Sequence, residues 1–118
     1  MSEVVLWVDD LAGASAFYSA LLKLQLKVDA PGYRQLASAD NLMHLHEVPS
    51  EYRNDSGDYP SREDAAIKPV FVVESIQAAQ AAVADVIRVG KSFEHDGAVM
   101  LDVIDPEGNV IQLKQPAL

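Results

Sequence analysis

Asp105-Pro106-Glu107-Gly108-Asn109 leads directly into Val110-Ile111-Gln112-Leu113-Lys114 near the end of the chain. A chain reversal is predicted here, because proline presets φ near the value that a turn requires and Gly108 and Asn109 both tolerate a positive φ. The strand after this turn alternates, with Gln112 on one face and two branched aliphatic residues, Ile111 and Leu113, on the other. Gln112 is therefore expected to face a cavity or solvent.

The same pattern occurs earlier in the chain, where Asp40-Asn41-Leu42-Met43-His44-Leu45-His46-Glu47 matches Gly108 to Gln115 at an offset of 68 residues. A second match, at an offset of 65, aligns the stretch that begins at Glu3 with the stretch that begins at Lys68. Self-similarity of this kind indicates a repeated structural unit. The sequence therefore predicts two copies of one module.

The composition is that of one globular domain, with 118 residues of which 49% are hydrophobic and 23% charged. No apolar run is long enough to span a bilayer, and the N-terminus lacks the pattern of a signal peptide, so a cytoplasmic location is expected. The absence of cysteine excludes disulfides and thiolate chemistry. A formal charge of −9 disfavours nucleic acid and anionic membranes as partners and favours a cationic ligand. The alternative is that the negative charge only keeps the protein soluble.

The sequence of residues 1–49 predicts one strand, one helix and three further strands. The first strand places Glu3, Val5 and Trp7 on one face and aliphatic residues on the other, which should meet the helix. Asp9 or Asp10 is expected to cap that helix. Residues 50–66 are polar and without period, so they predict a linker loop, in which two tyrosines, Tyr52 and Tyr59, could close over a ligand.

Residues 67–118 predict the second copy. An apolar strand starts at about Lys68, Ser75 caps a helix whose stripe reaches Ile87, and Gly90 ends that helix. A short strand near residues 92–95 and a hairpin from about Ala98 complete the copy. His95 lies beside acidic residues and is expected to face solvent.

Two such modules, closed by Asp105-Pro106-Glu107-Gly108-Asn109-Val110-Ile111-Gln112-Leu113 and opened by Val4-Val5-Leu6-Trp7-Val8-Asp9-Asp10-Leu11, resemble the vicinal oxygen chelate superfamily. This group contains glyoxalase I, extradiol dioxygenases, fosfomycin-resistance enzymes and bleomycin-resistance proteins. The resemblance implies a single α+β domain over residues 1–118, in which two tandem βαβββ modules form curled sheets around a concave pocket. Because one fold hosts many chemistries, it does not specify the reaction.

The resemblance also implies that metal ligands come from the first and last strand of each module, which in this chain are Glu3, His44, Lys68 and Gln112. Glu3 and His44 are acceptable ligands for a divalent cation and Gln112 is a weak one, whereas an ammonium has no lone pair to offer. Lys68 stands where a histidine is usual, and it could replace the metal by pairing with Glu3. No metal is therefore predicted; if one is present, Glu3, His44 and Gln112, or Glu3 with His44 and His46, should bind it.

The favoured hypothesis is a metal-free binding protein that sequesters a small cationic or aromatic compound, such as a bleomycin-type antibiotic, and forms a homodimer. Its ligand-binding residues would be Glu3, Val5, Trp7, His44, His46, Lys68 and Gln112. The alternative is a lyase, isomerase or dioxygenase of the glyoxalase type that depends on Ni, Zn, Mn or Fe.

Three plainer readings stand beside these hypotheses. The domain could be catalytically silent and serve association or regulation. His44 and His46 could be half-buried, hydrogen-bonded strand residues with no functional role. Glu3 could act as a general base in a dry pocket, although the sequence does not indicate which proton it would take.

Overall fold

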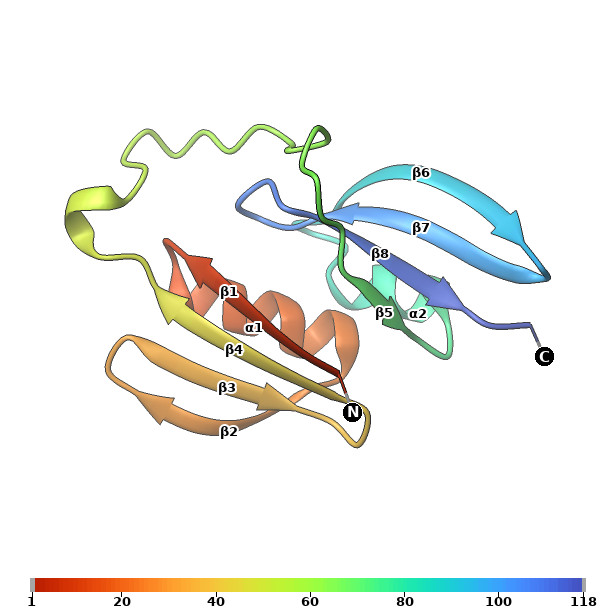
Figure 1. Ribbon diagram of the computed structural model, residues 1–118, viewed down its shortest axis with the longest axis horizontal. Helices are drawn as coiled ribbons and strands as arrows, with labels where there is room; N and C mark the ends of the chain where they lie inside the picture. The colour runs from red at the N-terminus through yellow and green to blue at the C-terminus, as the bar shows by residue number, and fades with distance from the viewer. Residues whose placement is uncertain (1, 118) are drawn as a thin grey trace. The chain divides into compact units, whose positions relative to one another are not determined.

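The computed structural model describes residues 2–117, which form two compact units of similar design with the boundary between Tyr59 and Pro60 (Figure 1). The first unit contains β1 (Ser2–Val8), α1 (Leu11–Leu22), β2 (Gln25–Ala30), β3 (Tyr33–Ala37), β4 (Asn41–Glu47) and a 3₁₀ turn, η1 (Ser50–Tyr52). The second contains β5 (Val70–Val72), α2 (Ile76–Ala82), β6 (Arg88–His95), β7 (Ala98–Ile104) and β8 (Val110–Gln115). The predicted α+β architecture of two βαβββ modules is confirmed. The unit boundary lies inside the predicted linker.

Each unit holds one curled four-stranded sheet, and the strand orders are β1-β4-β3-β2 and β5-β8-β7-β6 (Figure 1). In both sheets the first strand runs parallel to the last, and the remaining neighbours are antiparallel. Val5 is paired with His44 in the first sheet, and Val70 is paired with Gln112 in the second. The two offsets found in the sequence, 65 and 68, are therefore also the offsets of the strand register.

Helix α1 begins where the sequence predicts. The side chain of Asp10 caps it by accepting a hydrogen bond from Gly13 N at 2.9 Å, which satisfies one of the free amides of the first turn. The helix ends at Lys23, which adopts the left-handed conformation with φ 54°. Its buried stripe packs against β3 and β4. Asp9, in contrast, accepts hydrogen bonds from Asn54 N and the Tyr59 hydroxyl.

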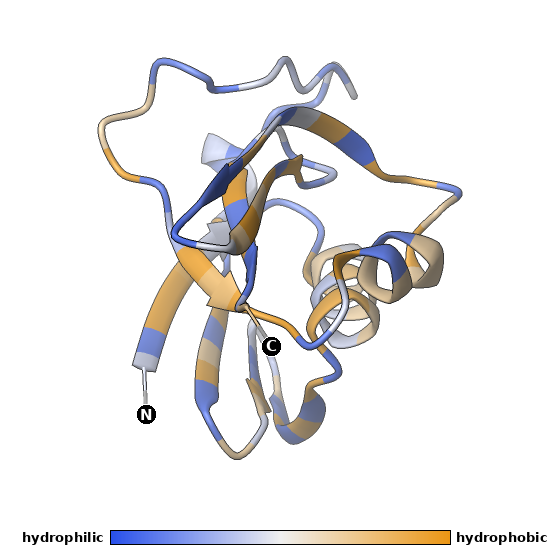
Figure 2. Ribbon diagram, turned by 90° about the vertical axis from the view of Figure 1, so that its right-hand side faces the viewer, coloured by the Kyte–Doolittle hydropathy of each residue, from blue (hydrophilic) through white to orange (hydrophobic). Residues whose placement is uncertain are grey.

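One face of each sheet is covered by its helix and the other is left open. The strands are accordingly banded with alternating hydrophobic and hydrophilic residues (Figure 2). The core of the first unit consists of Val8, Ala14, Phe17, Tyr18, Leu21, Leu22, Leu24, Leu36, Met43 and Leu45, and that of the second of Phe71, Ile76, Ala79, Val83, Ala98, Leu101, Val103, Ile104, Ile111 and Leu113. On β1, Val8 is buried and Val4 and Leu6 are half-buried, whereas Glu3, Val5 and Trp7 are exposed, as predicted.

The turn between β7 and β8 is organised by the carboxylate of Asp105, which is only 2% exposed. It accepts hydrogen bonds from Glu107 N, Asn109 N and Asn109 Nδ2 at 2.9, 2.9 and 3.0 Å. Gly108 adopts φ 85°, whereas Asn109 does not use a positive φ. The chain reversal was predicted correctly, but Asn109 contributes through hydrogen bonds and not through its backbone conformation.

Three details of the second unit were predicted wrongly. Helix α2 ends at Ala82, β6 begins already at Arg88, and Gly90 lies inside β6. A Cβ on residue 90 would lie 3.2 Å from Asp102 Cβ, so this glycine permits close approach of β6 to β7 beside a register shift between Val89 and Ser92. Strand β5 begins at Val70, and Lys68 therefore precedes the strand instead of opening it.

Within residues 2–117, neither helix has the length and apolar character needed to cross a membrane.

Candidate functional site

The open face of the first sheet, on the side away from α1, gathers most of the predicted site residues. Glu3, Val5 and Trp7 project from β1, and His44 and His46 project from β4. Trp7 is 60% exposed and Val5 is 54% exposed, although both are large apolar side chains. This set, together with Tyr33 on β3, is called the aromatic face below.

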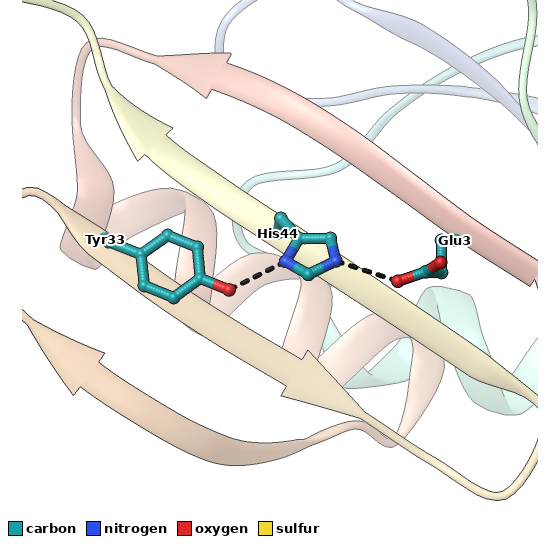
Figure 3. Close-up of polar contacts among 3 residues, drawn as sticks. All are labelled: Glu3, Tyr33 and His44. Carbon is teal, nitrogen blue, oxygen red and sulfur yellow. Dashed lines mark hydrogen bonds and ion pairs between the residues drawn. The ribbon is translucent and has the colours of Figure 1, made fainter.

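A hydrogen-bonded chain crosses three strands of the aromatic face (Figure 3). The hydroxyl of Tyr33 lies 2.7 Å from Nδ1 of His44, and Nε2 of His44 lies 3.1 Å from Oε1 of Glu3. Side-chain exposure is 21% for His44 and 61% for Glu3, so the imidazole is half-buried while the carboxylate is accessible. The chain holds the imidazole of His44 between its neighbours on β3 and β1.

The aromatic rings of this face are ordered by contact with one another. Trp7 stacks on His46 with ring centroids 4.7 Å apart and an interplanar angle of 23°. The ring of Tyr33 contacts both histidines, with ring centroids 5.0 Å apart for His46 and 6.0 Å apart for His44. Ring pairs at these separations attract each other, so an exposed tryptophan is kept in place without being buried.

The equivalent face of the second sheet has a different chemistry. Asp102 on β7, whose side chain is 9% exposed, accepts from Lys68 Nζ at 2.8 Å and from Gln112 Nε2 at 3.2 Å. Beside it lies a cavity of about 260 Å³ lined by Glu63, Lys68, Gly90, Lys91, Asp102, Ile104 and Val110. Lys68 is paired with Asp102 within its own unit, while its predicted pairing with Glu3 of the first unit stays a prediction.

The residues that correspond to metal-ligand positions do not form a suitable donor set. Lys68 offers an ammonium that is held by Asp102, and Gln112 directs its amide nitrogen, not its oxygen, at the same carboxylate. Glu3 and His44 remain as two good donors, with His44 engaged on both nitrogens. Among the described side chains, no three of His, Cys, Asp or Glu gather in a group that could hold an ion.

The other sequence-predicted residues are placed as follows. His95 is 76% exposed and pairs with Asp96 at 3.3 Å, so its predicted exposure is confirmed. Tyr52 is exposed on η1, whereas the hydroxyl of Tyr59 donates to Asp9 Oδ2 at 2.8 Å. Tyr59 is therefore fastened to the end of β1 in the first unit.

Two residues of these sites were missed by the sequence analysis, Tyr33 and Asp102. Asp102 carries a recognisable signal, because it is the only charged residue in the apolar run Ala98-Val99-Met100-Leu101-Asp102-Val103-Ile104. Tyr33 carries a weaker signal. Its position directly after Gly32 marks only the start of a strand, and its contact with His44 depends on the pairing of β3 with β4.

Comparison with known proteins gives one family. The model of the Glyoxalase/Bleomycin resistance protein/Dioxygenase superfamily matches residues 1–113. No curated protein sequence matches the chain.

Solved structures with the same fold are similar to this chain over nearly its whole length. A glyoxalase/bleomycin resistance protein from Albidiferax ferrireducens T118 has a TM-score of 0.71 and 19% identity, with 98% of each chain covered. A lactoylglutathione lyase from Agrobacterium tumefaciens has a TM-score of 0.66 and 22% identity, with 98% of this chain and 92% of that chain covered. An antibiotic binding protein from Streptomyces sp. CB03234 has a TM-score of 0.67 and 22% identity, with 98% of this chain and 93% of that chain covered. At these identities the similarity establishes the fold and not the activity.

Proposed function

Because the chain belongs to the glyoxalase/bleomycin resistance protein/dioxygenase superfamily, we propose that it binds a small aromatic or cationic molecule on its aromatic face without the help of a metal ion. Glu3, Val5, Trp7, His44 and His46 would contact the ligand, with Tyr33 added from the structure. Lys68 and Gln112 would contribute a polar patch on the second unit. The protein would act by sequestering its ligand and would leave the ligand's bonds intact.

The observation that carries this proposal is the state of Trp7. Its indole is 60% exposed yet stacked on His46, so it offers a flat apolar surface that is already ordered. A ligand ring that covers it removes apolar area from water and requires little further ordering of the protein, which favours binding. Exposed Val5 extends this apolar surface along β1.

The charge of the face favours a cation. Glu3 carries an accessible carboxylate on the same face of β1 as Trp7, and the whole chain has a formal charge of −9. A positively charged group is attracted both to a carboxylate and to the face of an indole. An antibiotic of the bleomycin type is one candidate, since a structure of the same fold is named as an antibiotic binding protein.

A second candidate function is a metal-dependent lyase, isomerase or dioxygenase of the glyoxalase type. It is favoured by one observation, the approach of Glu3 Oε1 to His44 Nε2 at 3.1 Å, which brings two good donors for a divalent cation together. Lys68 and Gln112 argue against it, because both direct hydrogen-bond donors at Asp102.

The first test uses Trp7, which is the single tryptophan of the chain. Its fluorescence should be quenched saturably by flat aromatic amines, and binding should weaken in His46→Ala while the matched exposed-site variant Tyr52→Ala leaves it unchanged. A library of aromatic compounds that leaves the fluorescence untouched would contradict the proposal.

The second test is metal analysis of the purified protein. We expect Ni, Zn, Mn and Fe at well below one ion per chain, and full ligand binding in the presence of a chelator. Stoichiometric metal that disappears in His44→Ala would establish the second candidate in place of the first.

The same proposal includes a homodimer in the cytoplasm, as is common for small binding domains of this size. Light scattering of the purified protein measures the oligomeric state directly.

A further inference from the structure

The hydrogen bonds that join Tyr33, His44 and Glu3 have a defined direction. A carboxylate only accepts, so the contact of Glu3 Oε1 with His44 requires that Nε2 carry the proton. In a neutral imidazole the other nitrogen, Nδ1, is then an acceptor, and the Tyr33 hydroxyl donates to it at 2.7 Å. With His44 neutral, the proton of the Tyr33 hydroxyl is therefore committed to Nδ1 of His44.

This direction decides what the chain of three side chains offers to a ligand. The Tyr33 oxygen has given away its only proton and presents lone pairs, and the carboxylate of Glu3 presents lone pairs and a negative charge. Both ends of the chain are therefore hydrogen-bond acceptors. A ligand that is itself only an acceptor, such as a carboxylate, finds no donor at either end.

We propose that Tyr33 is a specificity-determining residue that selects aromatic ligands carrying N–H bonds on a positive charge, namely protonated amines, amidines and guanidines. The aromatic ring of the ligand would cover Trp7, and its N–H groups would donate to the Tyr33 oxygen and to Glu3. A quaternary ammonium of the same shape has the charge but no N–H bond, so it would lose the interaction with Tyr33. This inference rests on the proposed function, because it specifies the ligand of the same aromatic face.

The second sheet provides an internal contrast. Tyr33 is paired with His46 across β3 and β4, and the equivalent pair across β7 and β8 is Met100 with Lys114. A thioether is only a weak acceptor, and the ammonium of Lys114 is a donor. At this pair of positions the second unit therefore lacks the acceptor that Tyr33 provides in the first.

The test compares probes that share one phenyl ring and differ in the charged group attached to it. The probes are benzamidinium, benzylammonium, benzyltrimethylammonium and benzoate, and binding is measured by quenching of Trp7 and by calorimetry. We expect benzamidinium to bind about tenfold more tightly than benzyltrimethylammonium, which is the range for a hydrogen bond that involves a charged group. Benzoate should bind most weakly.

The deciding variant is Tyr33→Phe, which keeps the ring against His46 and removes the oxygen. We expect the preference for benzamidinium to fall to about twofold while the affinity for benzyltrimethylammonium stays within about twofold, so that the second probe also reports that the face is intact. The matched control is Tyr52→Phe, which removes the same atom from an exposed tyrosine on η1 and should change neither affinity.

The outcomes separate the two proposals. If the aromatic probes bind with equal affinity, or if Tyr33→Phe retains the full preference, the role of Tyr33 is refuted while binding on the aromatic face stands. If no probe binds, the proposed function itself is refuted and the inference with it.

Discussion

The two sheets share one backbone register and present opposite chemistry. Val5 is paired with His44 in the first sheet as Val70 is paired with Gln112 in the second, yet one open face carries rings and acceptors while the other carries lysines around a buried carboxylate. At matching positions of the two units, the negative Glu3 corresponds to the positive Lys68, and Trp7 corresponds to Val72. The duplicated scaffold therefore fixes where side chains are presented, not which groups they carry.

The reason lies in how the two faces of each sheet are constrained. Buried positions beneath the helices stay apolar in both units, as in the matching pairs Leu36 with Met43 and Val103 with Ile111. A polar group at these positions would be buried without a partner, which costs several kilocalories per mole. The open faces have no such constraint, so they were free to diverge.

The largest expected effect concerns the turns that precede the last strand of each sheet. Asp105→Ala removes three hydrogen bonds to a buried carboxylate and should lower the free energy of unfolding by about 3 kcal/mol. Ser38→Ala, in the matching turn, removes only the long contacts to Asp40 N and Asn41 N and should cost less than about 1 kcal/mol. Urea unfolding of both variants measures the difference, and equal losses would mean that the turns are equivalent after all.

The next effect concerns the polar cluster of the second sheet. Asp102→Ala leaves Lys68 and Gln112 without their shared acceptor and should lower stability by about 2 kcal/mol, since water reaches the half-exposed ammonium and moderates the loss. Gln35 occupies the matching position on β3, and Gln35→Ala should change stability by less than about 0.5 kcal/mol. A loss as large in Gln35→Ala would show that the first sheet depends on an equivalent polar contact.

A smaller effect is expected on ligand binding. Trp7→Ala should weaken the binding of aromatic amines about tenfold, because the stacking surface is lost. Val72→Ala, at the matching exposed position of β5, should change affinity by less than about twofold. Calorimetry is the measurement here, since the first variant removes the fluorophore. Comparable losses in both variants would place the ligand on the second sheet as well.

The smallest effect concerns the opposite charges at matching positions. Glu3→Gln should weaken the binding of benzamidinium about threefold and reduce its dependence on salt, because exposed charges contribute little and are screened. Lys68→Gln should have a smaller effect on that affinity, less than about twofold, because the Lys68 ammonium already pairs with Asp102. An improvement in Lys68→Gln would mean instead that Lys68 repels the bound cation.

The sequence was sufficient for the features that depend on local chemistry. Alternation placed Glu3, Val5 and Trp7 on one face of the strand, and a helix cap was predicted at Asp9 or Asp10, of which the structure uses Asp10. The tandem repeat predicted that both units share one order of elements along the chain, a strand, a helix and three strands. These features are encoded within a few residues of one another, which is why pattern alone identifies them.

The features that were missed depend on cross-strand neighbours. The sequence around Gly90 indicates the end of a helix, but in the structure Gly90 lies beside Asp102. The sequence suggests Glu3 as a partner for Lys68, but the side chain that pairs with Lys68 in its own unit is the same Asp102. Tyr33 gains its role only because β3 lies against β4. No spacing in the sequence reports these contacts, since the residues involved belong to different strands.

The chain of Tyr33, His44 and Glu3 also has a mechanical consequence. It links β3, β4 and β1, and β1 lies at the edge of its sheet, paired with β4. A guest that bridges Tyr33 and Glu3 would tie the edge strand to a strand two places away, so its affinity would add to the free energy that opposes fraying of β1. Slower amide hydrogen exchange along β1 would then be a direct measure of occupancy, read from the backbone and independent of the indole.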